Sequence, residues 1–132
     1  MASRHQARQS VISLLYALEL NGKNDNFITE FLQEKKIRNE AKNFTLSLYN
    51  GVLEHLQNLD ERIDTFLNEN KIHQIGHIER AILRLGAFEL LYTDTLGAIV
   101  INEAVELAKE MANENAPKLI NGVLDGLQKA KK

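Results

Sequence analysis

Apolar residues recur at intervals of three and four along most of the chain, and no segment alternates apolar and polar residues over the length of a strand. Proline occurs once in 132 residues, at Pro117, so little interrupts a helix. This pattern predicts an all-α fold, a compact bundle of about six or seven helices.

The expected helices can be placed from their start and stop signals. Ser3 and Gln6 have the spacing of a capping box, and Asn21-Gly22 ends the helix that follows. A short helix is expected around 27–32, and residues 35–38 form a connector.

A long third helix is expected to be capped by Asn39 and to run to about residue 67. Asn50-Gly51 interrupts it, but the apolar period resumes in phase, so one helix with a bend is predicted. A polar loop over 68–76 precedes a densely apolar, central helix over 77–92.

Two helices complete the chain after a turn over 93–97. The first carries an apolar stripe from Ile101 to Met111. The second is expected to be capped by Asn115, with Pro117 tolerated in its first turn.

Length and composition set the class of protein. A chain of 132 residues with 44% hydrophobic and 26% charged residues is expected to form a single domain, 1–132. The absence of cysteine excludes disulfides and zinc fingers and fits a cytoplasmic location. No secretion signal is expected at the start, and Arg84 and Glu89 interrupt the most apolar stretch, so no membrane span is predicted.

Catalytic motifs are absent from the sequence. There is no glycine-rich phosphate loop, no His-Glu-x-x-His pair and no Gly-x-Ser-x-Gly elbow. The histidines at positions 5, 55, 73 and 77 do not have the spacing of metal ligands on one helix face. We therefore expect a binding protein that is not an enzyme and needs no metal, cofactor or small-molecule substrate.

Charge is distributed unevenly along the chain. The net charge is −2, but residues 1–18 carry Arg4 and Arg8 and no carboxylate, and the last residues are rich in lysine. Such a local basic face suits phosphate binding, although terminal cations that only solvate the chain ends would give the same pattern.

Four motifs, in order, resemble the NusB family of bacterial transcription antitermination factors. The central one is Ile78–Leu85 (IERAILRL) followed by FEL, and the next is Ile101–Lys109 (INEAVELAK). The closing motif is Asn121–Asp125 (NGVLD), and the opening helix has Arg4-x-x-Ala7-Arg8 and then Leu15-Tyr16. Each motif is weak alone, but together they span nearly the whole chain.

The resemblance implies a bundle of two helical subdomains and a function in transcription. Members pair with the small-ribosomal-subunit protein NusE and bind the single-stranded boxA RNA element with it. The complex joins RNA polymerase and suppresses termination on ribosomal RNA operons.

The resemblance also implies an RNA-binding surface. Arg4 and Arg8 are four residues apart, so both are expected on one exposed helix face, where guanidinium groups can bind phosphate. Tyr16 is either a surface on which an unstacked base rests or a core tyrosine. The other expected RNA-binding residues are His5, Asn115, Lys118 and Leu119, of which the last three could equally be a cap, a solvated lysine and a core leucine.

The family places its protein partner on the central helix. Glu79 is the main expected contact, with Arg80, Arg84 and Glu103 as neighbours; the alternative is a charged outer face. This chain has fewer arginines in its opening helix than many members and has Leu96-Gly97 where proline is common.

Two other functions remain open on the sequence. One is a stand-alone NusB-like module that targets RNA, and the other is a helical protein–protein adapter that never binds RNA.

Overall fold

The computed structural model describes residues 2–131, and within that range the chain forms seven α-helices, one short 3₁₀ helix and no strand. The predicted all-α class is confirmed. The helices are α1 (Arg4–Asn21), α2 (Asp25–Glu34), α3 (Asn39–Glu54), α4 (Leu56–Asp64), α5 (His77–Tyr92), α6 (Gly97–Met111) and α7 (Ala116–Ala130), with the 3₁₀ helix at Ile72–Gln74.

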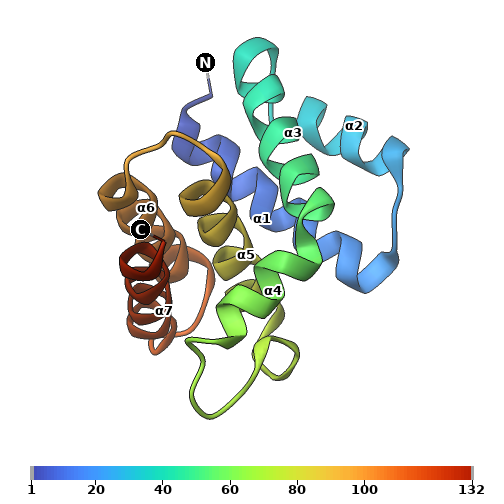
Figure 1. Ribbon diagram of the computed structural model, residues 1–132. Coiled ribbons are helices and arrows are strands. Elements are labelled where there is room, and N and C mark those ends of the chain that lie inside the picture. The colour runs from blue at the N-terminus through green and yellow to red at the C-terminus, as the bar shows by residue number, and fades with distance from the viewer. Residues whose placement is uncertain (1, 132) are drawn as a thin grey trace.

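Helix α5 lies in the middle of the molecule, as its dense apolar pattern predicts (Figure 1). Every residue from Arg80 to Leu90 is buried. Helices α1 and α3 pack on one side of α5, and α4, α6 and α7 pack around the rest of it (Figure 1). The buried apolar side chains of these helices form one continuous core.

The ends of α1 form as the sequence predicts. The Oγ atom of Ser3 accepts a hydrogen bond from the backbone N–H of Gln6 at 3.0 Å, and the Gln6 side chain accepts one from the Ser3 N–H at 2.8 Å. At the other end Gly22 has φ +80°, a conformation that glycine adopts without strain.

The prediction of one long helix over 39–67 is wrong. The chain breaks at His55 into α3 and α4, while Gly51 stays inside α3. A Cβ atom on Gly51 would lie 2.1 Å from Cζ of Phe88, so this glycine allows the α5 phenylalanine to approach the α3 backbone. Gly51 therefore serves packing and does not mark a turn.

One predicted helix cap is wrong, and a second, Asn115, stands at the predicted cap position without the side-chain bond. Asn39 is not the cap of α3 but its first residue, in a left-handed conformation with φ 55°. Asn115 makes no side-chain cap; instead Oδ1 of Asn113 accepts from the backbone N–H groups of Asn115 and Ala116 at 2.9 and 3.1 Å. Pro117 lies in the first turn of α7, as predicted.

The segment predicted as a polar loop over 68–76 is partly ordered by burial. Ile72 is fully buried in the 3₁₀ helix, and its N–H donates to Asp64 at 2.7 Å. None of the helices within residues 2–131 is long and apolar enough to cross a membrane.

Candidate nucleic-acid interface

Arg4 lies exposed in the first turn of α1, as predicted. Its guanidinium carbon is 4.2 Å from the centroid of the Phe44 ring on α3. None of the ion pairs found within residues 2–131 involves Arg4, so its charge is available to an anion. The contact with Phe44 fixes the side chain while leaving its donors facing outward, because a cation over a ring binds through the flat face of the guanidinium.

The expectation that Arg8 is exposed is wrong. Arg8 is 3% exposed, and its Nε and Nη2 atoms each donate to the Glu89 carboxylate at 2.8 Å. Burial lowers the pKa of Arg8, but the bonds to Glu89 and Glu103 outweigh burial and raise it. One turn further along α1 than Arg4, the helix meets α5 and α6, and carboxylates from those helices neutralise the arginine.

His5 bridges α1 and α6. Its Nδ1 atom is 3.1 Å from Glu103, and its Nε2 atom is 2.8 Å from Glu110. Two carboxylate neighbours require both ring nitrogens to donate, so the imidazolium form fits this geometry. Burial alone would lower the pKa of His5, but the bonds to Glu110 and Glu103 raise it, and the bond from His5 lowers the pKa of Glu110.

Tyr16 lies at the surface, near the C-terminal end of α1. Its side chain is 37% exposed, which settles the choice between rim and core for the position of the ring. The ring meets that of His77 edge to face, with centroids 6.0 Å apart and planes at 81°. Tyr16 can therefore offer an apolar face to a base from outside.

The start of α7 is exposed and carries a cation. Asn115 and Lys118 face solvent, while Leu119 is half-buried against the core. The Asn113 amide in the preceding turn donates to Glu79 at 3.4 Å, which joins this turn to the start of α5. The start of α7 and the start of α5 therefore belong to one surface.

Glu79 is the only expected partner contact without a strong pairing in the described residues. It is half-buried in the first turn of α5. Glu103, by contrast, is engaged by His5 and Arg8, with its side chain 22% exposed. Among these expected contacts, Glu79 thus remains the side chain best placed to meet another protein.

Arg80 and Arg84 are buried, so the structure contradicts both the expected partner contact and the alternative of a charged outer face. Arg80 donates to the carbonyl oxygens of Ile72 and Ile75 at 2.8 and 3.0 Å. Arg84 donates twice to the Asp60 carboxylate, at 2.8 Å each. These guanidinium groups connect α5 to α4 and to the 68–76 segment, and they are not available to a partner.

Glu19, on α1, is a second carboxylate that binds these two arginines. It pairs with Arg80, with Arg84 at 3.1 Å and with Nδ1 of His77 at 2.9 Å. Burial raises the pKa of Glu19, but these three cationic or donor neighbours lower it overall. The sequence analysis missed Glu19, Asp60 and Glu89. The signal that could have found their role was the presence of charges inside the apolar run of α5, which need buried partners.

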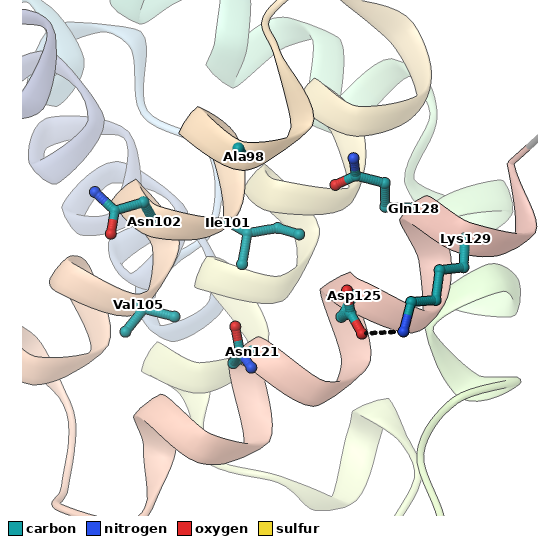
Figure 2. Close-up of a pocket in the computed structure, with 8 residues that line it drawn as sticks. All are labelled: Ala98, Ile101, Asn102, Val105, Asn121, Asp125, Gln128 and Lys129. Atoms are coloured by element: carbon teal, nitrogen blue, oxygen red, sulfur yellow. Dashed lines mark ion pairs between the residues drawn. The ribbon is translucent and has the colours of Figure 1, made fainter.

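Outside this surface, an open depression of about 560 Å³ lies between α6 and α7, and Figure 2 shows the residues that line it. Its charged groups are Asp125 and Lys129, which pair with each other at 2.9 Å. Within residues 2–131 no group of three or more His, Cys, Asp or Glu side chains is placed to hold a metal ion.

Comparison with known proteins gives consistent results. The sequence model of the NusB family matches residues 5–129. The chain is 70% identical over 132 residues to the transcription antitermination protein NusB of Campylobacter jejuni (strain RM1221), covering 100% of both chains. It is 62% identical over 129 residues to that of Campylobacter lari, covering 98% of both.

Solved structures agree with the sequence matches. A crystal structure of the antitermination factors NusB and NusE in complex with dsRNA has a similar chain, with a TM-score of 0.86, 33% identity and 96% coverage of both chains. The solution structure of NusB from Aquifex aeolicus has a TM-score of 0.82 at 33% identity and covers 98% of this chain and 90% of that one.

Proposed function

Since the chain belongs to the NusB family, we propose that it is a transcription antitermination factor that binds boxA RNA together with NusE. The complex then joins RNA polymerase on ribosomal RNA operons. In this function the whole chain, 1–132, acts as one RNA-binding domain in the bacterial cytoplasm, and it has no catalytic role.

One observation carries the proposal. The chain matches, over 96% of both chains and with a TM-score of 0.86, a protein whose crystal structure holds NusE and dsRNA. The surface supports it as well, because α1 and the start of α7 carry exposed cations outside the ion pairs of residues 2–131, and α1 carries an exposed aromatic ring. These are the chemical groups that single-stranded RNA requires.

The exposure and pairing of each residue support the following assignment of RNA contacts. Arg4 and Lys118 bind phosphates, Tyr16 supports a base, and Asn115 and Leu119 complete the surface at the start of α7. His5 holds α1 against α6 beside this surface. Arg8 does not contact RNA; it positions α1 through Glu89.

Of the four residues expected to contact the protein partner, only Glu79 is proposed to touch it. Glu79 faces NusE from the first turn of α5, next to the RNA-binding turn that Asn113 connects to it. Glu103 acts through His5 and Arg8, and Arg80 and Arg84 act only inside the protein. A shared boundary between Glu79 and the start of α7 explains how one protein can hold RNA and NusE together.

The test is an RNA titration with and without NusE at several salt concentrations. We expect the chain to bind boxA RNA more tightly than a scrambled RNA of the same composition, and NusE to increase the affinity. The logarithm of the affinity should fall with the logarithm of salt concentration by about 0.7 per phosphate contact.

Each other outcome has a clear meaning. RNA binding without antitermination of ribosomal RNA transcription would leave an RNA-targeting module. No preference for boxA and no effect of NusE would leave a protein–protein adapter and reject the proposal.

A further inference from the structure

A hollow of about 310 Å³ lies between α1, the end of α2 and the end of α6. Gln9 and Ser13 of α1 line one wall, and Phe31 of α2 and Met111 of α6 give it apolar surface. Lys35, directly after α2, completes the rim. None of these residues belongs to the expected RNA-binding set.

The hollow lies on the same face of α1 as Tyr16. Gln6, Gln9, Ser13 and Tyr16 follow one another at intervals of three and four, so they form one stripe along the helix. We call these four residues the polar α1 stripe. It begins one turn after Ser3 and ends at the Tyr16 ring, so RNA that rests on Tyr16 and follows this face of α1 passes over the hollow.

The cation at the rim is free to bind a phosphate. The Lys35 ammonium lies 5.9 Å from the Phe31 ring centroid, and none of the ion pairs within residues 2–131 involves it. Lys36, next in the chain, is equally exposed but does not line the hollow.

The inner wall carries hydrogen-bond acceptors. The Gln9 amide donates to Glu110 at 3.0 Å, which fixes the side chain and leaves its carbonyl oxygen as an acceptor. The negative charge of Glu110 is offset by His5 at 2.8 Å. A phosphate is thus favoured at Lys35, and a base edge with amino donors is favoured at Gln9 and Glu110.

We propose that this hollow receives one unpaired nucleotide of the bound RNA, with its phosphate on Lys35 and its base among Phe31, Met111 and Gln9. The inference rests on the proposed function and deepens it, since it adds a base-binding subsite on the face of α1 that carries Tyr16. Both the apolar walls and the polar edge are what recognition of a splayed-out base requires.

The test compares two neighbouring lysines. In titrations of the full chain with boxA RNA, Lys35→Gln should weaken binding about tenfold, because a charge-assisted bond at a built site is lost. It should also lower the salt slope by about 0.7. Lys36→Gln removes the same charge one residue away and should change affinity by about twofold or less, as expected for screened surface charge.

A second pair of variants tests whether the empty volume of the hollow matters, independently of the lysine charge. Ser13→Leu fills the hollow and should weaken binding while leaving the salt slope unchanged. Ser47→Leu, at an exposed serine of α3, is its control. Thermal melts of all four variants check that each is folded.

Three outcomes decide the matter. Equal effects of Lys35→Gln and Lys36→Gln would mean that the connector supplies only general positive charge, and the subsite would be rejected. Full affinity in Ser13→Leu would reject it too. If the parent chain itself does not bind boxA RNA, with or without NusE, the proposed function fails and the subsite fails with it.

Discussion

Arg4 and Arg8 are one helical turn apart in α1, but their surroundings give them opposite roles. Arg4 rests on Phe44 with its donors exposed, whereas Arg8 is enclosed and bound by Glu89, which is itself 2% exposed. A buried carboxylate is stable only while its cation remains, because an unpaired charge inside a protein is costly.

Removal of Arg8 should therefore damage stability. Arg8→Ala leaves Glu89 without its bidentate partner, and we expect it to lower the free energy of unfolding by about 3 to 5 kcal/mol in urea titrations. Arg4→Ala is the matched control and should cost less than about 1 kcal/mol, since it loses only a surface contact with a ring.

For RNA binding, Arg4→Ala should have the larger effect and Arg8→Ala the smaller one. Arg4→Ala should lower the salt slope by about 0.7, and Arg8→Ala should leave the slope unchanged wherever it is still folded. Equal stability of the two variants would contradict the role assigned to Arg8.

His5 makes stability depend on pH. Its pKa is raised from 6.5, so its stabilising bonds are complete below about pH 6.5 and are lost as the pH rises through the folded-state value. The pKa of Glu110 is lowered from 4.5, so its share is present above about 4.5 and is lost as the pH falls through the lower folded value.

Urea unfolding between pH 6 and 9 tests this linkage. The parent should lose stability as the pH rises through the folded-state pKa of His5, and His5→Asn should remove that loss. His73→Asn changes a histidine whose side chain is 73% exposed and should leave the loss in place. An unchanged pH profile in His5→Asn would mean that the bridge to α6 contributes nothing to stability.

For individual charged residues, the sequence is a poor guide to whether the side chain is exposed or buried. Arg4 lies at the surface as expected, and the structure decides between the two positions left open for Tyr16, but the helical period gives no partner for Arg8, Arg80 or Arg84. Their carboxylates come from positions as far as 95 residues away in the chain, so only the tertiary fold brings each pair together.

Among the elements, α3 and α5 depend on one glycine. The Phe88 ring lies against the backbone of Gly51 at a distance that admits no Cβ atom. Gly122, in α7, is also helical, but nothing lies within 4 Å of a Cβ atom added there. Substitutions at these two glycines therefore distinguish the effect of packing on stability from the effect of helix propensity.

Alanine at these two glycines should have opposite effects on stability. Gly51→Ala should lower the free energy of unfolding by about 1 to 3 kcal/mol, because the clash with Phe88 exceeds the gain in helix propensity of about 1 kcal/mol. Gly122→Ala should raise it by about 0.5 to 1 kcal/mol. Thermal or urea unfolding measures both, and a stabilised Gly51→Ala would show that α3 and α5 can move apart without cost.

Most helices were predictable from their period and their ends, but the joint between α3 and α4 was not. The apolar stripe continues in phase across His55, and the residue with the strongest breaking tendency, Gly51, is held inside a helix by the core. Packing therefore decided both outcomes: Gly51 stays in a helix despite its low helix propensity, and the helix ends at His55 although the apolar period continues. At the start of α7 the cap residue is Asn115 as expected, but Asn113 supplies the side-chain bonds, because both are asparagines and only the turn geometry decides which one reaches the backbone N–H groups.

At the scale of the whole molecule, the contact proposed for Glu79 predicts how the protein assembles with NusE. Glu79→Lys should weaken NusE binding by about tenfold or more, because it reverses a charge at the proposed contact. The fold should tolerate the change at a cost of about 1 kcal/mol, the value of a carboxylate in the first turn of a helix.

Calorimetry or an equivalent binding assay with purified NusE measures this effect. Glu106→Lys, at a 43% exposed carboxylate of α6, is the control and should keep the parent affinity. Equal affinities for the parent and both variants would exclude Glu79 from the interface.

The central place of α5 also affects how the protein is made. Helices α1 to α4 leave the ribosome before α5, and the apolar faces of α1, α3 and α4 pack against it. Helix α7 is the last to emerge, and Leu124 on it packs on Gly86 of α5. A nascent chain that stops before α5 therefore exposes its core to chaperones and proteases, and the native structure forms only when synthesis is almost finished.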